Sequence, residues 1–155
     1  SERGTVKGFP HAGWIDDDDF WASDVDIFVP AAIENQVHAE NAPRIQAKVI
    51  VEAANGPTTL EAEEMLTARG VEILPDILVN AGGVIVSYFE WVQNRSAQRW
   101  SLDDVDYKLR EVLWRACDAV VEARRDYEVD SRRDAAYAVA LSRLQTVYRQ
   151  RGIFP

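Results

Sequence analysis

The sequence predicts an α/β fold in which a small parallel β-sheet is followed by long helices. Three short apolar segments of strand length lie between residues 26 and 74, and a helical pattern separates the second from the third. From residue 100 onward the pattern is helical only. Strands that alternate with helices through short connections favour parallel pairing with right-handed crossovers, so the three strands correspond to half of a doubly wound sheet.

The predicted strands are residues 26–29, 48–52 and 71–74. Each is a short and nearly continuous apolar run, which is the pattern of a parallel strand buried on both faces. Pro30 ends the first strand, because proline cannot donate a backbone hydrogen bond to a sheet. A three-stranded sheet has two unpaired edges unless another segment covers them.

Residues 59–69, between the second and third strands, are expected to form a helix. Thr58 is a suitable N-cap and Glu61 follows three residues later, which predicts a capping box. Gly70 is placed to end this helix. The helix would then connect two neighbouring strands of the sheet.

Two further helices are predicted in the last third of the chain, where a serine precedes an aspartate by three residues at the start of each apolar pattern. The pairs are Ser101 with Asp104 and Ser131 with Asp134. The second of these helices is expected to stop near Gly152. We therefore divide the chain into a sheet-containing part, residues 1–100, and terminal helices, residues 101–155.

The composition limits the classes of function. With 155 residues, 47% hydrophobic and 28% charged, the chain is of ordinary globular type and large enough for a core of its own. No apolar run reaches the length that spans a membrane. A formal net charge of −9 disfavours nucleic acid and anionic lipid as partners. The single cysteine, Cys117, cannot form an internal disulfide, which is typical of the reducing cytoplasm.

No pattern in the sequence is typical of a metal centre. Residues 16–19 are consecutive aspartates, but their side chains cannot all point inward, and aspartate favours the start of a helix. We therefore expect a helix N-terminus here. His11 and His38 lack metal-ligand or triad spacing, so no metal ligand is expected.

The turns after the three predicted strands are candidates for a ligand site, because open parallel sheets bind ligands at the carboxyl ends of their strands. These turns carry Ala31 and Ala32, then Asn55, then Asn80. Small residues leave room for a planar ring or a ribose, and the asparagines supply paired donors and acceptors. The alternative is that both asparagines adopt left-handed turn geometry. Two asparagines in parallel positions favour the ligand edge.

The segment after the third strand predicts a helix that two glycines open, Gly82 and Gly83. At helical spacing one stripe of this helix would present an amide, an apolar contact and a hydroxyl to a small polar ligand. The stripe consists of Asn80, Val84, Ser87 and Trp91. The alternative is a buried helix packed closely through its glycines, with Ser87 bonded back to the carbonyl of Gly83. The residues alone leave both interpretations open.

Three motifs resemble those of the hexameric glutamate dehydrogenases, in the same order. Residues 80–91 read Asn-Ala-Gly-Gly-Val-Ile-Val-Ser-Tyr-Phe-Glu-Trp, residues 51–59 read Val-Glu-Ala-Ala-Asn-Gly-Pro-Thr-Thr, and residues 29–36 read Val-Pro-Ala-Ala-Ile-Glu-Asn-Gln. The flanks at 6–10 and 135–140 match as well. Leucine and phenylalanine dehydrogenases share the Asn-Ala-Gly-Gly-Val-Ile turn but not the Ser-Tyr-Phe-Glu-Trp that follows here.

The resemblance implies part of an NAD(P)-dependent glutamate dehydrogenase, which interconverts L-glutamate with 2-oxoglutarate and ammonia and forms a homo-hexamer. Only the C-terminal half of a Rossmann-like cofactor domain and the terminal helices match. No Gly-x-Gly-x-x-Gly follows a strand, and the family's catalytic lysine and aspartate lie in an N-terminal domain without a counterpart here. We therefore expect no catalytic residue in this chain, and no activity from the chain alone.

The resemblance also implies roles for particular residues. Asn55 and Asn80 match positions at the nicotinamide end of the cofactor cleft, and the turn of Ala31 and Ala32 matches the adenosine side. Ser87 matches the residue that hydrogen-bonds the side-chain carboxylate of glutamate, and Val84 matches one that packs on its methylenes. The motifs do not distinguish NAD from NADP.

Two other functions stay open. The first is a dehydrogenase for an apolar amino acid, against which Ser87 argues. The second is a short non-catalytic binding module, whose helical part would pair with a partner chain. In either a fragment or a module, apolar surface on the helices would be exposed, and Trp91, Trp100 and Trp114 are the candidates for it.

Overall fold

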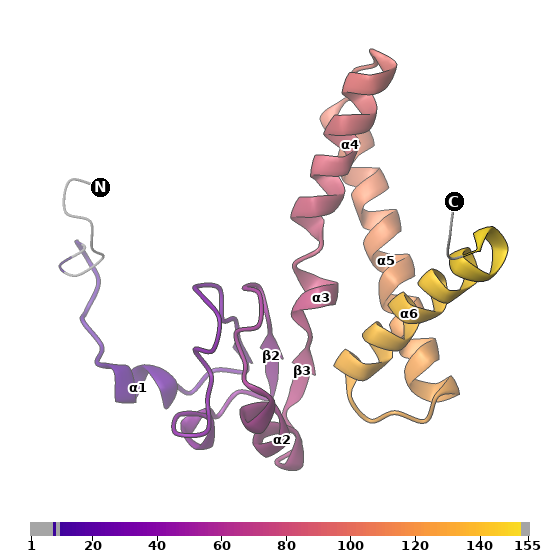
Figure 1. The fold of residues 1–155 in the computed structure, drawn as a ribbon. Helices are drawn as coiled ribbons and strands as arrows, with labels where there is room; N and C mark the ends of the chain where they lie inside the picture. The colour runs from indigo at the N-terminus through magenta and orange to yellow at the C-terminus, as the bar shows by residue number, and fades with distance from the viewer. Residues whose placement is uncertain (1–7, 9, 153–155) are drawn as a thin grey trace.

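The computed structural model describes residue 8 and residues 10–152, and it confirms the α/β fold (Figure 1). Three parallel strands form one sheet in the order β1-β2-β3. They are β1 (Ile27–Phe28), β2 (Val49–Val51) and β3 (Glu72–Leu74). Ile27 pairs with Val49, and Val49 pairs in turn with Glu72. All three predicted strands are therefore present, each shorter than predicted. In the N-terminal flank at 6–10, residues 6, 7 and 9 lie outside the described part.

Helices connect and follow the strands. They are α1 (Asp17–Trp21), the 3₁₀ helix η1 (Ala42–Arg44), α2 (Leu60–Ala68), α3 (Asp76–Val79), α4 (Gly82–Ser96), α5 (Leu102–Asp126) and α6 (Arg132–Arg151). In Figure 1, β3 continues through the short α3 into α4, and α5 returns antiparallel to α4. The last helix, α6, packs on α5 and reaches back to β3. The N-terminus of α6 thus lies beside the sheet.

The helix caps follow the sequence with one correction. Ser101 and Asp104 form the predicted capping box, with both reciprocal bonds at 3.1 Å. The N-cap of α2 is Thr59, whose side chain accepts from the backbone N–H of Ala62, and not the predicted Thr58. Thr58 is held in a parallel bridge to Val37, and this pairing shifts the helix start by one residue.

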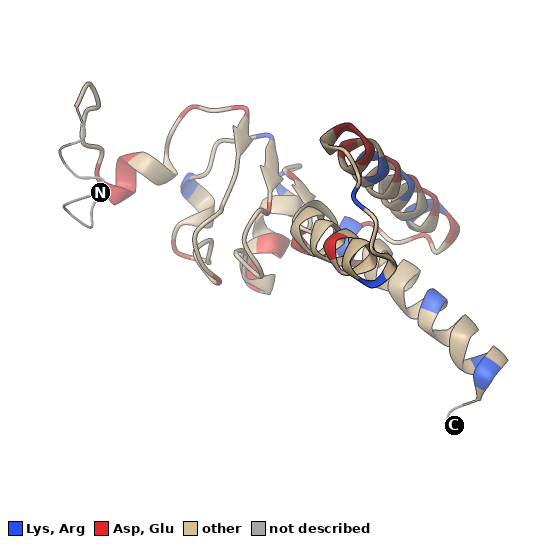
Figure 2. Cartoon of the chain, turned by 90° about the horizontal axis from the view of Figure 1, so that it is seen from above, with Lys and Arg blue, Asp and Glu red and all other residues tan. Residues whose placement is uncertain are grey.

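Two other predicted helix starts are present. Ser131 caps α6 by accepting from the backbone N–H of Asp134, and its own hydroxyl turns toward Glu63 on α2. The consecutive aspartates open α1, where Asp16 accepts from the N–H of Asp19 at 2.9 Å. Figure 2 shows this acidic segment at one end of the molecule and basic residues toward the C-terminal end of α6. The described residues contain no cluster of three or more His, Cys, Asp or Glu arranged to hold a metal ion.

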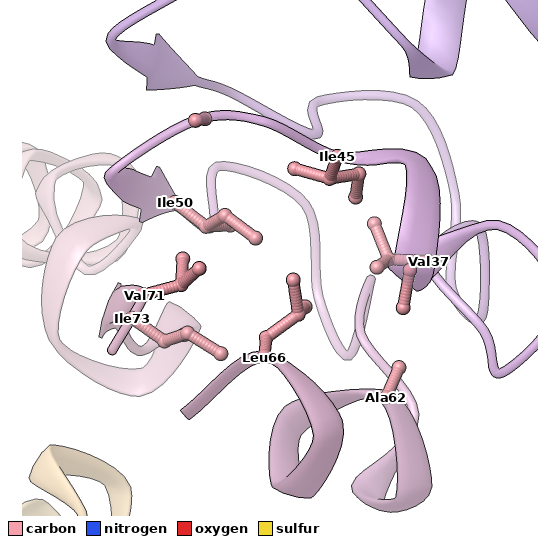
Figure 3. Close-up of a cluster of buried hydrophobic side chains, with 9 residues drawn as sticks. Val37, Ile45, Ile50, Ala62, Leu66, Val71 and Ile73 are labelled. Carbon is pink, nitrogen blue, oxygen red and sulfur yellow. The ribbon is translucent and has the colours of Figure 1, made fainter. Parts of the chain in front are cut away.

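The main core lies between one face of the sheet and α2 (Figure 3). Its buried side chains are Val37, Ala42, Ile45, Ala47, Ile50, Ala62, Leu66, Val71 and Ile73. A second, smaller core joins α3, α5 and α6 through Leu78, Val120, Ala123, Ala135 and Ala136. The terminal helices therefore pack against the sheet-containing part of the chain.

Replacing Leu66 by alanine should lower the free energy of unfolding by about 2–5 kcal/mol, because this side chain is fully buried among the core residues of Figure 3 and its loss leaves a cavity. Urea unfolding of the chain, followed by circular dichroism, measures the change. The matched control is Leu60→Ala on the same helix, where the leucine is 71% exposed and the expected change is within about 0.5 kcal/mol. Equal losses in both variants would contradict this core.

Much apolar surface stays exposed on the helices, as expected. Trp91 on α4 and Trp114 on α5 are exposed, as the sequence predicted. Trp100 is not: it is half-buried, packs edge-on against Phe89 and has the ammonium of Lys108 over its ring. The outer edge of the sheet is also open at Ile27. Across the described part of the chain, no helix combines the length and apolarity needed to cross a lipid bilayer.

Candidate functional site

The turns that follow β2 and β3 meet through two asparagines. The side-chain amide of Asn80 donates to Oδ1 of Asn55 at 2.6 Å, and it lies 3.4 Å from the carbonyl oxygen of Ala54. The alternative of left-handed turn geometry is wrong for both residues. Asn80 has a φ of −92°, Asn55 has no positive φ, and Gly56 takes the left-handed position in that turn. Contact between the two side chains, and not local turn strain, therefore accounts for this pair.

The turn after β1 lies beside the same edge. The carbonyl oxygen of Pro30 accepts from the backbone N–H groups of Ala53 and Ala54, at 3.1 and 3.0 Å. Ala31 and Ala32 follow directly and are exposed. The structure thus brings the small residues of the first turn next to the turn that carries Asn55, as the parallel order of the strands requires.

Val84 and Ser87 lie on the exposed face of α4, whose first residue is Gly82. Val84 is 71% exposed and Ser87 is exposed, so the alternative of a buried helix is wrong for this face of α4. The interpretation of a closely packed glycine helix also fails. A Cβ added at Gly83 would meet nothing within 4 Å among the described residues. The first turn of α4 is therefore open to a ligand beside Asn80.

Sequence reasoning missed the ion-pair cluster that lies behind this edge, with Arg133 at its centre. The guanidinium donates from Nε to Glu63 at 2.6 Å, from Nη2 to Glu52 at 2.7 Å and from Nη1 to Asp76 at 2.9 Å. These carboxyl groups come from α2, from the end of β2 and from the start of α3. One side chain of α6 therefore connects three elements of the sheet-containing part.

The cluster is largely shielded from water. The Glu52 residue is 0% exposed and the Arg133 side chain is 18% exposed. Burial lowers the pKa of the Arg133 guanidinium, but hydrogen bonds and charge from Glu63 and Glu52 raise it by more, so it lies above the ordinary value. Arg133 is therefore a permanent cation at a buried position.

Asp76 links this cluster to the asparagine turns. Its Oδ2 accepts from the backbone N–H of Gly56 at 2.7 Å, and its own N–H donates to Glu52 at 2.9 Å. Burial raises the pKa of the Asp76 carboxyl, but the N–H groups of Gly56 and Ile77 and the charge of Arg133 lower it by more. The pKa of Asp76 thus lies below the ordinary value.

The shift at Asp76 predicts a loss of stability in acid. Its folded-state pKa lies below the unfolded value of 3.8, so the unfolded chain takes up a proton first as the pH falls. The stabilisation is complete well above 3.8 and is lost as the pH falls through the folded-state pKa. Unfolding in urea at a series of pH values should therefore show a shallower acid dependence in Asp76→Asn. Asp118→Asn, at an exposed position of α5, is the control, and equal acid dependence in Asp76→Asn and the parent would refute the assignment.

One sequence signal pointed toward this cluster. Glu52 ends an apolar strand and Asp76 starts a helix directly after another, so both acidic residues lie at the same edge of the sheet. Their partner follows much later in the chain, 81 residues after Glu52. Nothing in the local pattern separates Arg133 from its neighbour Arg132.

Comparison with known proteins identifies the family of the chain. The sequence model for glutamate/leucine/phenylalanine/valine dehydrogenases matches residues 1–152. The chain belongs to this dehydrogenase family. It is 48% identical to glutamate dehydrogenase of Thermotoga maritima over 154 residues, which is 99% of the chain and 37% of the relative. It is 45% identical to NAD-specific glutamate dehydrogenase of Clostridioides difficile and 44% identical to NADP-specific glutamate dehydrogenase A1 of Halobacterium salinarum, covering 97% and 100% of the chain.

Solved structures of the family share the fold. Hetero-hexameric glutamate dehydrogenase from Thermus thermophilus, in its Leu-bound form, superposes with a TM-score of 0.84 at 33% identity, over 89% of this chain and 33% of that one. Glutamate dehydrogenase from Peptoniphilus asaccharolyticus gives a TM-score of 0.76 at 42% identity, over 81% of this chain and 32% of that one. The chain thus spans just over a third of the length of the dehydrogenases it matches in sequence.

Proposed function

We propose that this chain is part of an NAD(P)-dependent glutamate dehydrogenase and supplies one wall of its cofactor and substrate site. The observation that carries this proposal is the bonded pair of Asn55 and Asn80 beside the open first turn of α4. Residues 1–100 belong to the cofactor domain in this proposal, and residues 101–155 are the terminal helices. The names of the relatives support glutamate as the substrate.

The cofactor would lie along the edge of the sheet. Asn55 and Asn80 would contact its nicotinamide end, where their amides offer both donors and acceptors. Ala31 and Ala32 would lie along the adenosine side, where exposed small side chains leave room for the sugar. Relatives named NAD-specific and NADP-specific are both similar to this chain, so either nicotinamide cofactor fits the proposal.

The substrate would lie against α4. The exposed hydroxyl of Ser87 would donate to the side-chain carboxylate of glutamate, and Val84 would pack on its methylenes. A hydroxyl bonded to a carboxylate is a charge-assisted hydrogen bond, which discriminates against amino acids with apolar side chains. Ser87 therefore favours glutamate over leucine.

The reaction is the oxidative deamination of L-glutamate to 2-oxoglutarate and ammonia, and its reverse. A nicotinamide cofactor at this edge would supply the hydride chemistry, and the residues of this chain would hold its ring and the substrate in place. The acid–base lysine and aspartate of the family have no counterpart here, so we propose that the isolated chain is inactive. We further propose that the full-length protein is a homo-hexamer, as the family resemblance implies. We also propose that it lies in the reducing cytoplasm with no nucleic-acid or membrane partner, which the lone cysteine and the net charge support.

Steady-state kinetics of the full-length protein test the proposal. Glutamate and leucine are each offered with NAD or NADP, and formation of reduced nicotinamide is followed by absorbance. Turnover of glutamate well above that of leucine is expected, together with no turnover by the isolated chain. Preference for leucine would favour the dehydrogenase for apolar amino acids. Absence of turnover with every pair, with tight association to a second protein, would favour the binding module.

A further inference from the structure

We propose that Arg133 positions the nicotinamide end of the site from behind, by holding the two asparagine turns at a fixed separation. This inference rests on the proposed function of Asn55 and Asn80 as the cofactor edge. Arg133 itself is a positioning residue, since its guanidinium bonds to the carboxyl groups of Glu63, Glu52 and Asp76 and to neither asparagine side chain.

The guanidinium of Arg133 binds three carboxyl groups at once. Its three nitrogens donate to Glu63, Glu52 and Asp76, one nitrogen to each carboxyl group, within 2.6–2.9 Å. A planar guanidinium presents its donors in a fixed fork, so the directions of the three carboxyl groups are set together. One rigid group thereby fixes the positions of the ends of β2 and β3 relative to each other.

Hydrogen bonds connect these carboxyl groups to the turns that carry the two asparagines. Glu52 and Gly56 lie on either side of Asn55 in the turn after β2, and both bond to Asp76. Asp76 opens α3, and the N–H of Asn80, which ends that helix, donates to the carbonyl of Asp76 at 3.0 Å. Displacing Asp76 would therefore move both turns. The 2.6 Å bond between the asparagine side chains depends on that separation.

The packing of α6 holds the ion-pair cluster in place. Arg133 lies in the first turn of α6, which also packs on α5 through the second core. A side chain on the long terminal helix thus determines the geometry of an edge formed by residues far earlier in the sequence. Rotation of α6 away from the sheet would break the three ion pairs of Arg133 as well as the ion pair between Arg132 and Glu72.

The test compares Arg133→Lys with the parent in the full-length enzyme. Lysine keeps a positive charge for the buried Glu52, but its single ammonium cannot reproduce the planar fork to three carboxyl groups. We expect the KM for the nicotinamide cofactor to rise about three- to tenfold, the value for weakening one neutral hydrogen bond between the cofactor and a displaced asparagine amide. The KM for glutamate at saturating cofactor should change by less than about twofold, since Ser87 and Val84 lie on α4, outside the cluster. A merely structural arginine would lower the melting temperature and the yield of active enzyme without this difference between the two KM values.

The neighbouring arginine provides a matched control. Arg132 lies in the same helical turn and forms an ion pair with Glu72 of β3, away from the asparagine turns. Arg132→Lys should leave the cofactor KM within about twofold of the parent. A rise in cofactor KM for Arg133→Lys but not for Arg132→Lys supports the proposal, and equal values for both variants overturn it.

Two further variants keep the outcome decisive. If Arg133→Lys yields no folded enzyme, Asp76→Asn removes one carboxylate charge from the same path, and a cofactor KM that stays at the parent value would overturn the proposal. Asn80→Ala separates this inference from the proposed function. A parent-like cofactor KM in Asn80→Ala contradicts the cofactor edge itself, whereas a raised KM there with a parent-like Arg133→Lys contradicts the role of Arg133 alone.

Discussion

Arg133→Met should lower the free energy of unfolding by about 3–5 kcal/mol, because it removes the only cation that the described structure places on the buried carboxyl group of Glu52. Glu52 Oε1 already has no hydrogen-bond partner in the described part of the chain, so the remaining oxygen depends on Arg133 and on the N–H of Asp76. Methionine fills part of the arginine volume and has similar helix propensity. The loss in free energy of unfolding is therefore due mainly to removal of the positive charge. Urea unfolding of the chain measures it.

Arg115→Met is the matched control for this prediction. Arg115 forms an exposed ion pair with Glu111 on α5, and such pairs contribute at most about 1 kcal/mol. Adding Glu52→Gln to Arg133→Met should recover part of the stability, because the buried charge is then removed as well. A loss in Arg133→Met no larger than that in Arg115→Met would show that the cluster does not stabilise the fold.

Ser87→Ala should raise the KM for glutamate in the full-length enzyme by about ten- to a hundredfold, because it removes a charge-assisted hydrogen bond to the substrate carboxylate. The cofactor KM should stay close to the parent value, since Ser87 lies on the exposed face of α4 beyond Asn80. Turnover of leucine, which lacks that carboxylate, should change little. Steady-state kinetics with each substrate in turn give all three values.

Ser96→Ala makes the same substitution at the other end of α4. The hydroxyl of Ser96 donates to the carbonyl of Val92 within its own helix, at 2.8 Å, so its removal should leave the KM for glutamate unchanged. An unchanged KM in Ser87→Ala would remove Ser87 from the substrate site. A similar rise in both variants would indicate an effect on the helix and not on the substrate contact.

The sequence was sufficient for local structure. Apolar runs and proline located the three strands, and the pair of Ser101 with Asp104 located the start of α5, because these signals depend on neighbours in the chain. It also placed Asn55 and Asn80 at one edge, since parallel strands end on the same side of their sheet. Motif resemblance identified the family, which the comparisons confirmed.

Tertiary structure decided the features that depend on distant partners. The cap of α2 moved from Thr58 to Thr59 because Thr58 pairs with Val37, a contact that no local pattern encodes. Trp100 is half-buried because Phe89 and Lys108 pack against it. Arg133 and Arg132 are indistinguishable in sequence, yet only Arg133 reaches Glu52 across 81 residues of chain. Local propensity locates the elements along the chain, whereas exact caps, burial and charge pairing depend on which surfaces the fold brings together.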